Sequence, residues 1–158
     1  MRKKSSYKPR PIRADNLNWI LAGMKKVGTL PSAGIELKLK NHEALDSILK
    51  GEGTRDHMDV LISAVNICEA LVRVRDDLGL DWANEIRAAQ DALYTMAKRG
   101  VEKNRFAFTG PEMTAMKLVM DVHDVQLDNC TVKEMEQALF IVYEEVRLKK
   151  ARPILQTV

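Results

Sequence analysis

The most constraining feature of the sequence is a long stretch, from about residue 55 to residue 78, that is apolar on two helical faces. One face recurs at helical spacing through Met58, Leu61, Ile62, Val65, Cys68 and Val72, and the other through Val60, Ala64, Ile67, Leu71, Val74 and Leu78. A helix that is apolar over most of its circumference has to be surrounded by other elements. The stretch therefore predicts a central buried helix, which Gly79 ends.

Amphipathic helices are predicted before and after this stretch. Asp15 is a good N-cap for a helix that ends at Gly28, and Asn41 can cap a helix that continues to Lys50. A further helix, capped by Asp81, ends near Gly100. Its inward-facing residues are expected to be Trp82, Ile86, Ala89, Leu93 and Met96 or Ala97.

Two threonine–glutamate pairs mark the starts of the last two helices. Thr109 with Glu112, and Thr131 with Glu134, match the capping box, in which each side chain satisfies a free backbone N–H of the other residue. The residues expected to face inward are Met113, Met116, Met120, His123 and Leu127 in the first helix and Val132, Met135, Leu139, Val142 and Val146 in the second. Helices joined by short loops predict a mainly α fold, an antiparallel helical bundle around the central helix.

Two short segments alternate apolar and polar side chains in the manner of a β-strand. Residues 35–40 show this period of two, and residues 105–108 show it again. They are candidates for one short two-stranded ribbon beside the helices.

The length and the charge distribution predict one folded domain with basic ends. A chain of 158 residues is long enough for one core, and we expect a helical domain at 15–150 between a basic extended arm at 1–14 and a basic tail at 151–158. The arm and the residues after Glu145 hold ten of the 25 basic residues, whereas the rest of the chain carries fifteen basic and all 22 acidic residues. Such asymmetry concerns binding partners rather than fold.

The distribution of apolar residues gives no sign of a membrane segment. No apolar run approaches the roughly 20 residues that cross a bilayer, and none near the start has the ~7–15 residues of a signal-peptide core. We therefore expect a cytoplasmic protein with no membrane partner.

Two clusters resemble metal sites but lack a required residue. In the stretch from His42 to Asp46, an aspartate stands where a zinc protease needs its second histidine. His123 follows Met120, where a di-iron bundle needs a glutamate three positions earlier. We expect the nearby Asp121, Asp124 and Asp128 to form a solvated face, and His123 to lie at the margin of the core, bonded to a backbone carbonyl.

Other reactive side chains also lack the partners that catalysis needs. His57 is expected at the surface of an acidic helix start, and Cys68 and Cys130 are expected as reduced thiols. No phosphate-binding glycine loop, nucleophile elbow or nucleophile with a nearby base is present. The sequence predicts no catalytic residues, no metal and no cofactor, and hence a protein that is not an enzyme.

Binding residues are predicted in two basic segments. The first is the arm, whose two prolines and few apolar residues leave its charge available to a partner, with Arg2, Lys3, Lys4, Tyr7, Lys8, Arg10 and Arg13. The second is a predicted loop at 98–105, with Lys98, Arg99, Lys103 and Arg105 next to Phe106 and Phe108, which could contact phosphates and stack on bases. Alternatively, Lys98 and Arg99 complement the C-terminal end of a helix.

Several blocks together carry a family resemblance: Tyr7 to Arg13, Leu37 to Leu45, Asp59 to Ile67, Arg105 to Glu112, and His123 to Leu127. The chain resembles small uncharacterised proteins encoded by bacteriophages and prophages of proteobacteria, and the similarity spans nearly its whole length. The resemblance implies a phage-derived protein that works in a bacterial cytoplasm, where small accessory proteins commonly bind host proteins or nucleoprotein complexes.

Two functions follow from these observations. In the first, the chain is a non-enzymatic phage-type accessory protein that binds a host protein or ribonucleoprotein complex, as an inhibitor of host defence or a modulator of host machinery. In the second, it is a nucleic-acid-binding regulator that uses the basic arm and the 98–105 segment. The sequence does not indicate an oligomeric state.

Overall fold

The structure is a computed structural model that describes residues 33–150. Within this range it contains five α-helices, two 3-10 turns and no strand: α2 (Ala33–Leu49), α3 (Arg55–Val74), η2 (Asp76–Leu78), η3 (Leu80–Trp82), α4 (Ala83–Lys103), α5 (Gly110–Asn129) and α6 (Val132–Arg147). The prediction of a mainly α fold is confirmed for this part of the chain. The predicted arm at 1–14, the predicted helix at 15–28 and the tail at 151–158 lie outside the described residues.

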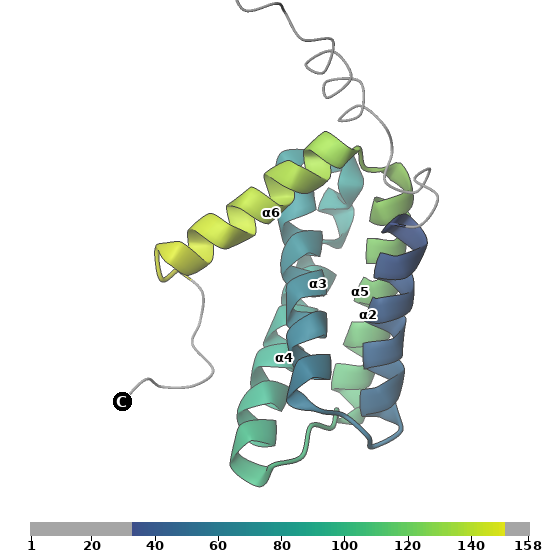
Figure 1. The fold of residues 1–158 in the computed structure, drawn as a ribbon, viewed down its shortest axis with the longest axis vertical. Helices are drawn as coiled ribbons and strands as arrows, with labels where there is room; N and C mark the ends of the chain where they lie inside the picture. Colours follow the sequence, from purple (N-terminus) through teal and green to yellow (C-terminus); the bar gives the residue numbers. More distant parts are fainter. Residues whose placement is uncertain (1–32, 151–158) are drawn as a thin grey trace, which may run out of the picture.

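Four of the helices stand together and the fifth crosses them. α2, α3, α4 and α5 form a closed set in which α2 contacts α3 and α5, and α4 contacts α3 and α5. Figure 1 shows these four helices running alternately up and down, while α6 leaves from the end of α5 and slants across α3, so that its second half stands away from the bundle. Helix α3 contacts each of the other four α-helices.

The two apolar faces of α3 are buried against different partners. Met58, Leu61 and Val65 belong to a core shared with α2, α4 and α5. Ala70 and Leu71 belong to a second, smaller cluster that includes Ala138 of α6. The α-helix ends at Val74, earlier than the sequence pattern suggested, and Leu78 joins the second cluster from η2. Val60 and Ala64, from the second predicted face, also belong to or pack on the first core, so the two clusters divide α3 along its length as well as around it.

The expected two-stranded ribbon is wrong. Residues 35–40 lie inside α2, and residues 105–108 form part of an irregular link between α4 and α5. In α2 the alternating Ile35 and Leu39 are 60 and 64 % exposed, whereas the polar Asn41 is buried. Asn41 is therefore an internal residue of α2 and not its cap. Because polar side chains occupy part of the inward face, the helical period was hidden in the sequence.

Both predicted capping boxes are present. The Thr109 N–H donates to Glu112 Oε2 at 2.8 Å, and the Thr131 N–H donates to Glu134 Oε2 at 2.8 Å. A third box, at the start of α3, uses a histidine: the Thr54 N–H donates to His57 Nδ1 at 3.1 Å, and the His57 N–H donates back to Thr54 Oγ1 at 3.3 Å. His57 is thus a half-buried capping residue.

The link between α4 and α5 is held by one aromatic ring. Phe106 is buried against the last turns of α4, directly over Gly100. A Cβ atom at position 100 would lie 2.2 Å from Cδ1 of the Phe106 ring, which is closer than real Cβ atoms approach. Asn104, with a φ of 51°, ends α4 in the left-handed conformation that turns the chain toward this ring.

Gly100→Ala should therefore destabilise the fold, because the added methyl group forces the Phe106 ring out of its place. Gly110→Ala is the matched control, since a Cβ there meets nothing within 4 Å. We expect the first variant to be about 1–3 kcal/mol less stable than the second in urea unfolding followed by circular dichroism. Equal stabilities would contradict this packing.

Candidate binding surface

Helix α6 has an apolar face that no described residue covers. Its exposed members are Leu139, Phe140, Tyr143 and Val146, of which the last three are 64, 65 and 61 % exposed. We call these four residues the outer stripe. The expectation that Leu139 and Val146 face inward is wrong, because α6 packs on α3 through the neighbouring side, where Ala138 is buried and Ile141 and Val142 are partly buried.

Ion pairs keep the inward side of α6 against α3. Arg73 Nη2 donates to Glu145 Oε1 at 2.7 Å, and Arg75 Nη2 donates to the backbone oxygen of Asn129 at 3.1 Å. Arg75 Nε lies 3.0 Å from Glu134 Oε1 at an angle that makes the contact an ion pair rather than a hydrogen bond. The contacts of Glu134 and Glu145 lie on the side of α6 that faces α3, so they orient the outer stripe toward solvent, whereas the Asn129 contact joins Arg75 to the end of α5.

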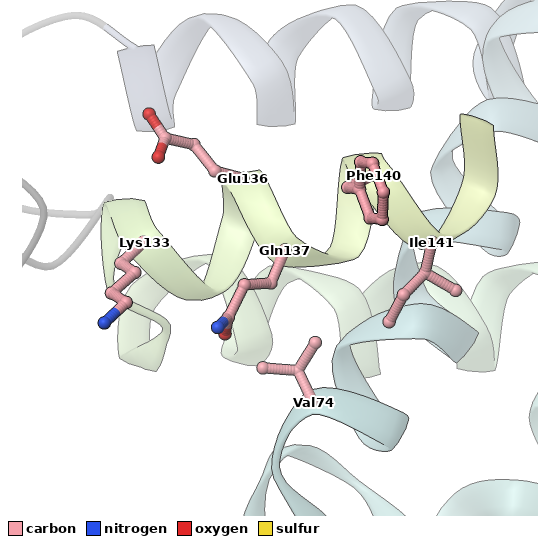
Figure 2. A pocket seen from close by; sticks show the side chains of 6 residues that line it. All are labelled: Val74, Lys133, Glu136, Gln137, Phe140 and Ile141. Atoms are coloured by element: carbon pink, nitrogen blue, oxygen red, sulfur yellow. The ribbon is translucent and has the colours of Figure 1, made fainter. Parts of the chain in front are cut away.

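An open hollow of about 570 Å³ lies beside the stripe. It is lined by Val74 from the end of α3 and by Lys133, Glu136, Gln137, Phe140 and Ile141 from α6. Figure 2 shows Gln137 and Ile141 directed toward Val74, and Glu136 directed away from it. A second groove, of about 440 Å³, is lined from α6 by Val142, Glu145 and Val146. The apolar surface of α6 is thus continuous with a hollow on each flank.

The predicted basic loop at 98–105 is mostly helix, since α4 continues to Lys103. Arg99 binds Glu112 through both guanidinium Nη atoms, at 3.2 and 2.7 Å, and donates to the Ala107 oxygen at 2.8 Å. Burial alone would raise the pKa of Glu112, but the hydrogen bonds from Arg99 and Thr109 lower it. Arg99 therefore holds α4 to α5 and is not available to a partner.

The other basic residues of this segment remain accessible. Lys98 lies over the Tyr94 ring, with Nζ 5.4 Å from its centre, and Lys103 and Arg105 are exposed with no ion-pair partner among residues 33–150. Phe106 is buried and cannot stack on a base, and Phe108 is partly buried against the same core. The segment therefore offers accessible charge without the aromatic platform that the sequence suggested. The basic residues of the arm, from Arg2 to Arg13, and Tyr7 lie outside the described residues.

The acidic face of α5 is largely exposed, as expected at Asp121 and Asp128, but two of its carboxylates also pair with basic residues of α2. Asp124 Oδ2 lies 2.7 Å from His42 Nε2, and Asp128 Oδ1 accepts from Lys38 Nζ at 2.6 Å. The two sequence clusters around His42 and His123 thus come together at the α2–α5 contact. Within residues 33–150, no three His, Cys, Asp or Glu side chains are grouped so that they could hold a metal ion.

His123 is fully buried and is bonded to a side chain rather than to a backbone carbonyl. Its Nδ1 donates to Gln126 Oε1 at 2.9 Å, and Gln126 Nε2 donates to the backbone oxygens of Cys68 and Leu78 at 3.0 and 2.6 Å. One glutamine therefore joins α5 to α3 and to η2. Burial lowers the pKa of His123, although the bond to Gln126 partly opposes this shift.

The two cysteines are free and buried, Cys68 in α3 and Cys130 after α5. Burial raises the pKa of Cys68 to about 12 and that of Cys130 to about 11. Since the thiolate is the reactive form of cysteine, neither thiol is a ready nucleophile at neutral pH.

Comparisons with known proteins give no relative. No family model, no curated protein and no solved structure matches the chain. In the part of the chain that the structure describes, no helix combines the length and the apolarity that crossing a membrane requires.

The buried His123 should make stability depend on pH. Its folded-state pKa lies below the ordinary value of 6.5, so the unfolded chain takes up the proton first. The neutral His123 side chain contributes fully to the free energy of unfolding above pH 6.5. This contribution is lost as the pH falls toward the folded-state pKa, by up to about 1.4 kcal/mol per pH unit. Urea unfolding at pH 7.5 and 5.5 should show this loss in the parent protein and a smaller loss in His123→Leu. His42→Gln is the control that leaves the buried histidine in place, and an unchanged pH dependence in His123→Leu would contradict the assignment.

Proposed function

We propose that the chain is a non-enzymatic binding protein that acts through contacts with other protein chains, with the outer stripe of α6 as its docking surface. The observation that carries the proposal is the exposure of Phe140 and Tyr143, each about two-thirds accessible, in a helix already anchored on its other side. Exposed apolar clusters of this kind mark interaction sites, and aromatic residues dominate binding energy at such sites.

The proposed biological setting follows from the resemblance to phage proteins. We propose that the protein works in a bacterial cytoplasm and binds a host protein or ribonucleoprotein complex, as an inhibitor of host defence or a modulator of host machinery. The exposed Lys103 and Arg105 and the basic arm add positive charge that would steer the chain toward acidic or phosphate-rich partners.

A nucleic-acid-binding regulator is the second candidate, and the basic arm favours it. Residues 33–150 do not favour nucleic-acid binding, because they hold sixteen basic and 21 acidic residues, a formal difference of −5. Arg99, one of the four basic residues in the 98–105 segment, is held by Glu112. A nucleic acid would therefore have to be bound mainly by the arm.

The docking role of α6 predicts that Tyr143→Glu loses a specific partner. Tagged parent and variant proteins should be incubated with a bacterial host lysate, and the captured proteins compared. Val125→Glu is the matched control, since Val125 is equally exposed but lies on α5. We expect the parent and the control to capture the same complex and the α6 variant to lose most of it. Equal capture by all three would show that the outer stripe is not the docking surface.

Deletion of residues 1–13 tests the second candidate. If the arm binds duplex DNA with its six basic residues, the logarithm of the association constant should fall with the logarithm of the salt concentration, with a slope of about −5. The deletion should remove most of that dependence. If the target is a protein, the dependence should be shallower, and Tyr7→Ala should weaken binding about as much as the loss of one basic residue. The absorbance ratio at 260 and 280 nm shows whether nucleic acid copurifies with the protein, which would favour the second candidate.

A further inference from the structure

Three residues of the outer stripe, Leu139, Tyr143 and Val146, belong to a series with the spacing of a coiled-coil seam. Val132, Glu136, Leu139, Tyr143 and Val146 follow one another at intervals of four, three, four and three residues. This 3–4 spacing keeps one side of a helix facing a partner helix over its whole length. The inward contact of α6 uses Ala138, Ile141 and Val142 and also the first residue of the seam, Val132, so the packing on α3 leaves the seam free from Glu136 onward.

Glu136, in the seam, and Arg147, directly after its last residue, carry opposite charges. Glu136 lies in the first half of the seam, exposed and without an ion-pair partner among residues 33–150. Arg147, at the other end, is exposed and binds Glu144 of its own helix through Nε and Nη2. Three of its five N–H donors remain for a further acceptor.

We propose that the occupant of the outer stripe is a second copy of this chain, which pairs its own α6 antiparallel to the first across a two-fold axis. The inference rests on the proposed function of the stripe as a protein-docking surface, and names its partner. An antiparallel pair brings Glu136 of each copy beside Arg147 of the other. A parallel pair would instead set like charges against each other, which opposes association.

The register that pairs these charges also pairs the aromatic residues. Both pairs are centred between Ile141 and Val142. When Glu136 lies opposite Arg147 of the second copy, Phe140 therefore lies opposite Tyr143 of the second copy. A two-fold contact of this type uses one patch twice and requires the patch to be self-complementary. The Glu136–Arg147 and Phe140–Tyr143 pairs both satisfy this requirement. In the same register Leu139 lies opposite Glu144 and Val146 opposite Gln137, so the pairing rests on the charged and aromatic residues.

The aromatic residues alone would supply roughly a third to a half of the area of a small specific interface. Aromatic side chains bury ~150–250 Å² each, so Phe140 and Tyr143, about two-thirds exposed, would contribute roughly 400–600 Å² in a symmetric pair. Leu139, Val146 and the charged ends add to this, toward the ~1,200 Å² at which specific interfaces begin. The second half of α6 stands away from the bundle (Figure 1), so a second helix can reach this side of it.

The test is the oligomeric state of the full chain, measured by sedimentation equilibrium over a wide concentration range. We expect the parent to dimerise, and Glu136→Lys or Arg147→Glu alone to raise the dimer Kd by about tenfold or more, since each creates two like-charge contacts. The double variant E136K/R147E restores both pairs and should return most of the affinity. Val125→Glu, on α5, should dimerise like the parent.

Disulfide trapping tests the register independently of the charges. A mixture of chains carrying Phe140→Cys and chains carrying Tyr143→Cys should oxidise to the mixed dimer, because opposite side chains of an antiparallel pair come within disulfide reach. Glu136→Cys alone should give no disulfide dimer, because the two copies of this residue lie about eleven residues apart along the pair, or ~16 Å. Efficient trapping of Glu136→Cys would indicate parallel pairing and would overturn the inference.

The outcomes separate this inference from the proposed function. A parent chain that stays monomeric at every concentration overturns the pairing, even if Tyr143→Glu still loses a captured host protein, in which case the stripe remains a docking surface for another partner. A monomeric chain whose capture is unaffected by Tyr143→Glu overturns both. Circular dichroism of each variant establishes that a lost dimer is not a lost fold.

Discussion

The structure depends on the burial of two separate faces of α3. One face is shared with α2, α4 and α5, and the other, toward the end of the helix, is shared with α6. Because apolar burial is the largest favourable contribution to folding, a helix with two such faces needs partners on both sides. The bundle and the slanting position of α6 are two consequences of the same helix.

Polar contacts then fix how the helices meet. Gln126 uses its amide group to join α5 to the backbone of α3 and η2, and it also satisfies the buried His123. At the other end of α5, Glu112 both caps the helix and binds Arg99 of α4. Unpaired polar groups are costly in a core, so these side chains favour one alignment of α5 over others that would bury a similar apolar area.

The capping boxes could be predicted from local sequence, whereas the cap at Asn41 was predicted wrongly and the distant pairings left no signal. The capping boxes at Thr109 and Thr131 involve residues three apart, and both are present. The pair of His42 and Asp124 joins residues 82 apart, which no local pattern reveals. In α2, Asn41 occupies an inward position where the sequence gives no apolar side chain, and the alternation of its neighbours imitated a strand.

The candidate surface shows that apolar periodicity alone does not tell which face of a helix is buried. Helices α3 and α6 both have two apolar faces, and periodicity does not say which of them has a partner. In α6 the residues assigned to the core, Leu139 and Val146, are the exposed ones. The same spacing that predicts burial inside one chain also predicts contact between chains, so only the packing of α6 on α3 separates the two cases.

The placement of the outer stripe has an evolutionary consequence. Leu139, Phe140, Tyr143 and Val146 lie on a helix whose attachment to the bundle uses other residues. Exposed positions tolerate substitution with small changes in stability, so the identity of the bound surface can drift while the bundle persists. A lineage of such proteins could therefore keep one scaffold and change what it recognises through a handful of codons in a single helix.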